Sequence, residues 1–266
     1  MSAGTIRTGI GGWTFDPWEG TFYPSDLAKK RQLEYASRQL TAIEVNGTYY
    51  SSQKPATFAK WASEVPEDFI FSLKASRFCT NRKILAEAGP SIEKFLTQGI
   101  TELGKHLGPI LWQFMGTKKF EPEDFEAFLA LLPKAQDGIA LRHVVEPRHD
   151  SFRTPEFVDL LAKYNVAVVC ADHHDYPMFP DVTADFVYSR LQKGTDETPS
   201  CYPEKEIGEW AKRFKAYADG GVPSDLSLIA PERKVEKKPR DVFAFFITGG
   251  KVNAPNGARL LQSKVS

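Results

Sequence analysis

Charged and amide side chains recur near the carboxyl ends of short apolar runs along this chain. They are Glu44, Asn46, Lys74, Glu146, Arg148 and His149. Burying a charge costs several kcal/mol unless the charge is paired, so this repeated arrangement is typical of a polar pocket that several strands build together. The pattern predicts a pocket but not yet a reaction.

Glu44 and Glu146 are the candidates for acid and base catalysis. Two separated carboxylates can divide these roles, as in glycoside hydrolysis, when their surroundings differ enough. Lys74, Arg148 and Arg190 are expected nearby, and cations favour the ionised form of a carboxylate. The pattern therefore does not favour a glycosidase.

The same three cations form a candidate clamp for an anionic group. A guanidinium presents a planar fork that suits phosphate or carboxylate, and we rank this reading above the glycosidase. Lys74 is also a candidate Schiff-base nucleophile, provided that burial lowers its pKa. The charged neighbours expected around Lys74 favour the clamp.

A histidine-based metal centre is a weaker alternative. Imidazole and carboxylate suit several divalent ions, and such groups gather between residues 149 and 175. They are His149, Asp172, His173, His174 and Asp175. Adjacent His173 and His174 point to opposite sides of an extended strand, and no HExxH-like spacing is present. We predict no metal ligands and leave the cofactor open.

Eight strand-like runs alternate with helix-like stretches. The runs are residues 6–10, 42–46, 69–75, 108–114, 143–148, 166–172, 185–191 and 241–247. The helix-like stretches are residues 33–40, 56–63, 90–103, 124–132, 155–164 and 203–218. Eight such units predict a closed (β/α)8 TIM-type barrel in preference to an open doubly wound sheet. The length of 266 residues suits a single domain over residues 1–266.

Strand periodicity predicts which side chains enter the barrel. Alternate residues of a strand face the same side. This rule groups Glu44 with Asn46, Ser72 with Lys74, Glu146 with Arg148, Cys170 with Asp172, and Tyr188 with Arg190. We expect all five pairs to face inward at the carboxyl ends of the strands, where barrel enzymes hold their substrates. A structural ion-pair network inside the barrel is the alternative.

Composition restricts the partners and the compartment. Lys+Arg and Asp+Glu both number 34, so no global field attracts a polyanion, and a nucleic-acid surface would have to be local. Three cysteines without CxxC spacing indicate a reducing compartment. No signal peptide and no apolar run long enough to span a membrane is found. We expect a cytoplasmic protein with no membrane partner.

The N-terminal segment GIGGWTFDPW combines glycines with aromatic residues. Thr14 occupies the position where GxGxxG requires glycine, so the segment is not a complete phosphate loop. Trp13, Phe15 and Trp18 could form a wall that stacks a sugar or a base, with packing in the core as the equal alternative.

The order of these segments resembles the YecE-like family, a domain of unknown function. The similar segments are GGWTFDPWEGTFYP, IEVNGTYY, FSLKASRFCT, LGPILWQF, VVEPRHDSF, VYSRLQKG and NAPNGARLL. The resemblance runs almost end to end and implies a TIM barrel. It implies no established activity. A likeness to barrels of the endonuclease IV and xylose isomerase kind brings in nucleic acid or sugar phosphate by analogy only.

The chain departs from the family pattern at three places. Asn81 and Gln192 stand where many members have histidine, and Thr248-Gly249 replaces an Asn pair. The loss of two imidazoles argues against a histidine-rich metal centre. The polar residues at the strand ends are retained, and Gln113 is among them.

We therefore expect an enzyme that binds a small anionic or phosphorylated substrate, such as a sugar phosphate or a nucleotide-like molecule. The expected catalytic residues are Glu44, Glu146 and Lys74. The expected substrate-binding residues are Trp13, Asn46, Gln113, Arg148, His149, Asp172 and Arg190. The reaction is open, with a hydrolase and an isomerase as candidates, and so are the substrate and the oligomeric state.

Two other readings remain at this point. The first is a nucleic-acid binding protein, endonuclease IV-like, with weak or no catalysis, in which Trp13 and Trp18 stack bases. The second is a pseudoenzyme scaffold with a blocked site.

Overall fold

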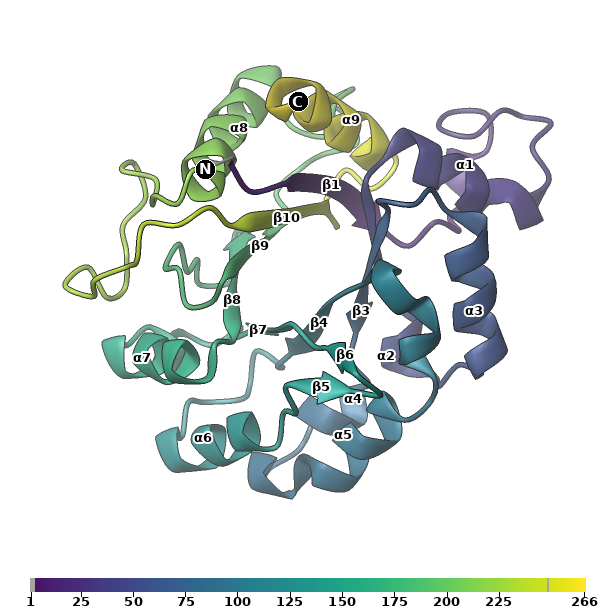
Figure 1. Cartoon of the computed structure of the whole chain (residues 1–266). Helices are drawn as coiled ribbons and strands as arrows, with labels where there is room; N and C mark the ends of the chain where they lie inside the picture. The colour runs from purple at the N-terminus through teal and green to yellow at the C-terminus, as the bar shows by residue number, and fades with distance from the viewer. Residues whose placement is uncertain (1–2, 248) are drawn as a thin grey trace.

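The computed structural model describes residues 3–247 and 249–266, so Thr248 lies outside the described part of the chain. Eight parallel strands close into a barrel in the order β1-β10-β9-β8-β7-β4-β3-β2. They are β1 (Ile6–Gly11), β2 (Ala42–Val45), β3 (Ile70–Lys74), β4 (Leu107–Gln113), β7 (His143–Glu146), β8 (Ala167–Asp172), β9 (Phe186–Leu191) and β10 (Asp241–Phe246). Figure 1 looks along the barrel and shows helices surrounding the ring of strands. The predicted (β/α)8 barrel is confirmed.

The helices cover the outer face of the barrel. They are α1 (Gln32–Gln39), α3 (Pro55–Glu64), α5 (Gly89–Leu96), α6 (Pro122–Ala130), α7 (Pro155–Tyr164), α8 (Glu204–Ala218) and α9 (Ala254–Val265). Two short helices, α2 (Gly47–Tyr50) and α4 (Arg77–Thr80), follow β2 and β3 directly. In the described part of the chain there are also five 3-10 segments: Asp16–Trp18, Lys29–Arg31, Leu85–Ala88, Ile100–His106 and Asp150–Phe152. A small hairpin of β5 (Ala135–Gln136) and β6 (Ile139–Ala140) precedes β7.

The predicted helix over residues 90–103 is shorter than expected. It ends at Leu96, and a 3-10 segment begins at Ile100. Gly99 between them has φ of +105°, which interrupts the helix, and a Cβ there would lie 2.7 Å from Pro55 of α3. The close approach of two segments thus sets the end of this helix.

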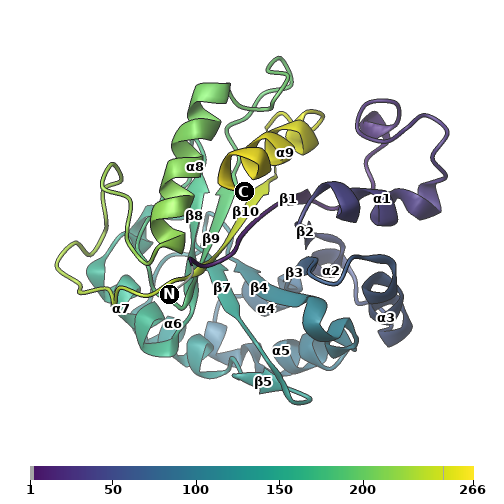
Figure 2. The same cartoon turned by 45° about the horizontal axis from the view of Figure 1, so that its top comes forward.

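The C-terminal helix α9 was not predicted from hydrophobic periodicity. It packs beside β1 and α8 (Figure 2), where the first and last strands of the barrel meet. Thr8 of β1 donates a hydrogen bond to Gln262 of α9 at 3.1 Å. The helix therefore covers the closing seam of the barrel.

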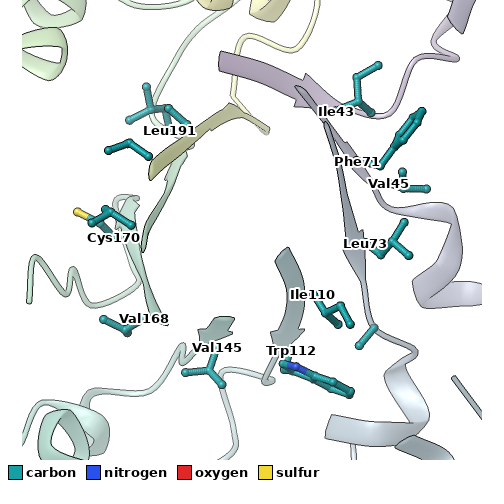
Figure 3. Close-up of a cluster of buried hydrophobic side chains, with 14 of the residues drawn as sticks. Ile43, Val45, Phe71, Leu73, Ile110, Trp112, Val145, Val168, Cys170 and Leu191 are labelled. Atoms are coloured by element: carbon teal, nitrogen blue, oxygen red, sulfur yellow. The ribbon is translucent and has the colours of Figure 1, made fainter. Parts of the chain in front are cut away.

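The strands are buried on both faces, which is why they read as nearly continuous apolar runs. The outward-facing side chains pack against the helices, as Figure 3 shows. The labelled ones are Ile43, Val45, Phe71, Leu73, Ile110, Trp112, Val145, Val168, Cys170 and Leu191. A second apolar cluster fills the interior, with small residues on β8 and aromatic residues such as Tyr188, Phe243 and Phe245 on β9 and β10.

One register shift interrupts the pairing of β3 with β4. Phe71 lies opposite Leu107, whereas Leu73 lies opposite Ile110, so β4 carries one extra residue at this β-bulge. Gly108 lies within the shift, and a Cβ there would approach Ile70 Cγ2 to 2.3 Å. Only glycine allows the two strands to come this close.

Within residues 3–247 and 249–266, no helix is long and apolar enough to cross a membrane.

Candidate active site at the carboxyl ends of the strands

The strand ends open into a cavity of about 620 Å³. Five of the predicted site residues line it: Asn46, Lys74, Gln113, Arg148 and Arg190. The sequence did not predict the other lining residues: Gly11, Tyr50, His173, Tyr176, Gln192, Ile247 and Lys251. The cavity therefore collects side chains from the end of most strands around the ring.

A wider hollow of about 940 Å³ lies away from this mouth, over the loops after β3 and β4. Its charges are mixed, and Lys118 is paired with Asp124 at 3.0 Å. None of the predicted site residues reaches it. We therefore place the site at the barrel mouth, despite the smaller volume.

Arg190 of β9 is the centre of a buried charge network. Its Nε and Nη2 donate to Oε2 and Oε1 of Glu44 at 3.1 and 3.0 Å. Its Nη1 donates to Oε1 of Glu146 at 2.6 Å. Burial by itself would lower the pKa of Arg190, but the two carboxylates raise it above its ordinary value. Arg190 is thus held by two acids and does not act as an independent anion clamp.

Glu146 of β7 is fully buried, and both of its oxygens accept hydrogen bonds. Oε2 accepts from Nε of Arg148 at 3.1 Å, from Nη2 of Arg148 at 3.0 Å, and from Nε2 of Gln113. Burial raises the pKa of Glu146, but Arg190 and Arg148 outweigh burial and lower it to about 2. A carboxylate this acidic is a weak base and is not a proton donor near neutral pH.

Glu44 of β2 is also fully buried, and it accepts from Tyr188 as well as from Arg190. The Tyr188 hydroxyl lies 2.8 Å from Glu44 Oε2 and 2.8 Å from Oγ of Ser72. Burial, followed by the charge of Glu44, raises the pKa of Tyr188. The phenol therefore stays protonated and acts as a fixed donor to the carboxylate.

Neither carboxylate is among the residues that line the cavity. Their oxygens are turned toward the two arginines, so the geometry fits anchoring better than proton transfer. Counted as formal charges, the two acids balance Arg148 and Arg190, which leaves Lys74 as the unbalanced cation of the group.

Lys74 projects from the end of β3 and is 7% exposed. Its Nζ lies 4.3 Å from the ring centre of Tyr49, and no carboxylate oxygen of the described residues lies within 4.0 Å of it. Burial, reinforced by the charge of Arg190, lowers the pKa of Lys74 from 10.5 to about 8. A nucleophilic role for Lys74 requires a pKa lowered by burial, and Lys74 has one.

Two further groups give the cavity its positive character. Lys251, which follows β10, has its Nζ 4.3 Å from the ring centre of Phe15, and burial lowers its pKa. Arg148 stacks on the ring of Tyr176 at 4.4 Å, and Tyr176 in turn stacks on His173 at 3.9 Å. The wall after β8 thus holds Arg148 in place from one side.

The structure places three predicted substrate-binding residues outside the cavity. Trp13 packs edge-on against Trp61 of α3, with ring centres 5.1 Å apart, so it belongs to the outer core. The Nδ1 atom of His149 accepts from the backbone amide of Ser151 at 3.1 Å and caps a 3-10 turn. Trp13 and His149 therefore have structural roles, and the third residue is Asp172.

The prediction that Asp172 faces the interior is wrong. Asp172 lies opposite Leu191 in the sheet, and both Leu191 and Cys170 face the helices (Figure 3). The interior positions of β8 are Val169 and Ala171 instead. Asp172 is paired with Lys193 at 2.9 Å on the outer side.

Trp18 does not present a face for base stacking. It is 1% exposed, and its Nε1 donates to the carbonyl of Lys251 at 2.9 Å. Of the two readings left open for the N-terminal aromatic residues, a stacking wall and core packing, the structure shows core packing.

Within the described ranges, 3–247 and 249–266, no cluster of three or more His, Cys, Asp or Glu side chains could hold a metal ion. His173 is occupied locally, because its Nδ1 accepts from the amide of Asp175 at 3.0 Å.

Comparison with known proteins adds a family and a fold. The family model described as "Protein of unknown function DUF72" matches residues 7–266. No curated protein matches the chain.

Solved structures with the same architecture include two DUF72 family proteins. One, from Thermotoga maritima MSB8, is 22% identical with a TM-score of 0.70, and the match covers 98% of each chain. Another, from Enterococcus faecalis V583, is 18% identical with a TM-score of 0.68, covering 98% of this chain and 97% of that one. A xylose isomerase-like TIM barrel fused to 4-hydroxyphenylpyruvate dioxygenase is 13% identical with a TM-score of 0.54, covering 99% of this chain and 44% of the fusion. At these identities the likeness shows a shared fold and carries no residue roles.

Proposed function

This chain belongs to the DUF72 family of proteins of unknown function, and we propose that it is a cytoplasmic enzyme that binds a small anionic or phosphorylated substrate at the barrel mouth. One observation supports the proposal above the others. Among the residues that the structure describes, the lining of the cavity includes Lys74, Arg148, Arg190 and Lys251 but no aspartate or glutamate. The two nearest acids lie beneath the surface and are neutralised by the arginines.

Two of the four cations would do most of the binding. Lys74 and Lys251 have no carboxylate within 4.0 Å among residues 3–247 and 249–266, so their charge is available to a ligand. Arg148 uses Nε and Nη2 to hold Glu146, and it offers the remaining edge of its guanidinium to a ligand. Asn46, Gln113 and Gln192 add amide groups that can orient a polar substrate.

The size of the cavity agrees with a metabolite. A volume of about 620 Å³ lies within the range of roughly 300–1,000 Å³ typical of small-molecule sites. A position at the carboxyl ends of the strands is the one where TIM-barrel enzymes hold their substrates.

A thermal-shift and calorimetric titration with sulfate, inorganic phosphate and phosphosugars tests this proposal. We expect stabilisation that saturates with ligand, because a ligand that binds only the folded state raises its stability by mass action. Lys251→Gln and Arg148→Ala should each weaken binding by roughly ten- to a hundredfold, the worth of one charge-assisted hydrogen bond. Lys212→Gln on the exposed side of α8 is the matched control and should bind like the parent.

Unchanged affinity in folded Lys251→Gln and Arg148→Ala variants would overturn the proposal. Nucleic-acid binding is the rival outcome. It would appear as retention of single-stranded DNA or RNA that falls steeply with salt, without stabilisation by the small anions.

A further inference from the structure

We propose that Lys74 is a covalent catalytic residue, whose amine condenses with the carbonyl carbon of a small compound that also carries a carboxylate or a phosphate. This inference rests on the proposed anion site and names its substrate class. Protonated Lys74 would bind an inorganic anion together with Lys251. In its neutral form, Lys74 would leave the anionic group of a carbonyl substrate to Lys251 and Arg148, and the carbonyl carbon would lie at its Nζ.

The partners of the other charges leave Lys74 free for this role. Arg190 and Arg148 make five charged contacts with Glu44 and Glu146 between them, so neither of these carboxylates is left to pair with the lysine. A strong salt bridge would hold the amine protonated and directed away from a substrate. Its absence among residues 3–247 and 249–266 is what a nucleophilic amine needs.

The surroundings of Lys74 also favour its neutral form. With a pKa of about 8, roughly a fifth of the amine is unprotonated at pH 7.4, compared with about 0.1% for an ordinary lysine. The causes are burial and the positive charge of Arg190, both of which belong to the folded state. The lysine is therefore activated by the barrel and not by its local sequence.

The proposed step balances without an added oxidant or reductant. The lone pair of Nζ forms the C–N bond, the C=O π electrons move to oxygen, and a proton passes from nitrogen to that oxygen to give a carbinolamine. A proton taken up from solvent water converts the hydroxyl group into water, whose departure breaks the C–O bond and leaves a protonated imine. One neutral amine, one carbonyl and one proton thus give one protonated imine and one water.

The charge network stabilises part of the charge of this product. A protonated imine carries the same single positive charge as the lysine ammonium. Burial and Arg190 disfavour that charge, and the buried carboxylates Glu44 and Glu146 offset part of the cost. Gln113 and Asn46 line the same cavity and can donate hydrogen bonds to the carbonyl oxygen as it gains charge. Glu44 and Glu146, which are poor groups for proton transfer, would therefore act here by offsetting part of the charge of the iminium ion.

Reductive trapping tests the inference. The full-length protein would be incubated with cyanoborohydride and pyruvate, or with cyanoborohydride and glycolaldehyde phosphate, and the adducts mapped by peptide mass spectrometry. We expect modification of Lys74 at least about tenfold above that of exposed lysines, given its larger neutral fraction. Acetone, which has no anionic group, should label Lys74 much less. The two anionic probes distinguish a carboxylate substrate from a phosphate substrate.

Lys74→Arg provides the decisive variant, because it keeps the positive charge but cannot form an imine. It should retain sulfate binding and lose the specific adduct, while Lys212→Arg, an exposed control on α8, should keep the Lys74 adduct. Labelling of Lys74 no greater than that of exposed lysines with both anionic probes, in a protein that still binds sulfate, would overturn this inference alone. Failure to bind sulfate would overturn the anion site itself.

Discussion

Arg190 and Glu44 are joined by two parallel hydrogen bonds, Nε to Oε2 at 3.1 Å and Nη2 to Oε1 at 3.0 Å. Their strands, β9 and β2, are separated in the ring by β10 and β1, so the pair crosses the barrel interior and not a strand ladder. The same guanidinium reaches Glu146 on β7. One side chain therefore fixes the relative positions of three strands beneath the cavity.

Replacing Arg190 should test this role. Arg190→Met leaves two buried carboxylates short of their main partner, and we expect a loss of about 3–5 kcal/mol of unfolding free energy or failure to fold. Urea denaturation measures the loss. Arg38→Met on α1, an exposed arginine, is the control and should change stability by less than about 1 kcal/mol. A stable Arg190→Met protein would mean that the network is dispensable for the fold.

Removing the charge of Lys74 should stabilise the protein. Its pKa lies at about 8 in the folded state and near 10.5 when exposed, a difference equivalent to about 3 kcal/mol. Below pH 8 both states are protonated and the folded state bears the full cost of the buried charge. We expect Lys74→Met to gain about 1–3 kcal/mol at pH 7.

The pH dependence of that gain gives an independent check. Between pH 8 and 10.5 the unfolded chain binds more protons than the folded one, so the parent becomes relatively more stable as pH rises. The stability gap between parent and Lys74→Met, measured by urea denaturation, should shrink between pH 7 and pH 10. A gap that is constant or grows over this range would contradict the burial of a charged amine.

Sulfate affinity should fall as pH rises through about 8, because Lys74 then loses its positive charge. Sulfate keeps its own charge over this range, so we expect roughly tenfold weaker binding at pH 9 than at pH 7 by calorimetry. His173 and Lys251 also line the cavity. Lys74→Arg isolates the lysine from them, since its guanidinium stays charged, and most of the pH dependence should disappear in this variant.

The three cysteines should be inert in the native protein. Cys79, Cys170 and Cys201 are buried and unpaired, and burial raises the pKa of each thiol to about 12. Because the thiolate is the reactive form, a thiol-disulfide exchange reagent should label none of them rapidly under native conditions. All three should react once the chain is unfolded in guanidinium chloride. Rapid labelling of one native thiol would reveal local opening at that residue.

The barrel itself could be predicted from sequence because parallel strands buried on both faces give short, regularly spaced apolar runs. All eight runs are strands in the structure. The 3-10 segment after α5 was missed because periodicity does not register the contact of Gly99 with α3.

The site was predictable only in part. Alternation shows which residues of a strand share a face but not which face is inside, and that is why Asp172 was misplaced. Its outward position follows from its register opposite Leu191, and there it pairs with Lys193. The five charged residues of the barrel mouth could be predicted from sequence, but their hydrogen-bond partners could not. Glu44 and Glu146 were therefore predicted to be catalytic, whereas in the structure their oxygens face Arg148 and Arg190.

Lys251 and Tyr176 were missed for another reason. They lie in segments after β10 and β8 that have no periodic pattern, and only the closure of the ring brings them to the cavity. A general rule, that residues just after barrel strands face the mouth, was the available signal for both.

The extra residue of β4 has a consequence for how the chain tolerates length changes. Because side chains alternate with a period of two, deleting one residue at Gly108 or Pro109 would shift the remaining strand by one step relative to β3. Trp112 would then be directed into the lumen in place of Gln113, and Leu111 would be turned toward the helices. The length of β4 before Gln113 therefore determines which side chain reaches the site. Deleting a single residue there would replace the Gln113 amide in the cavity by the Trp112 indole, although every other residue of the sequence is unchanged.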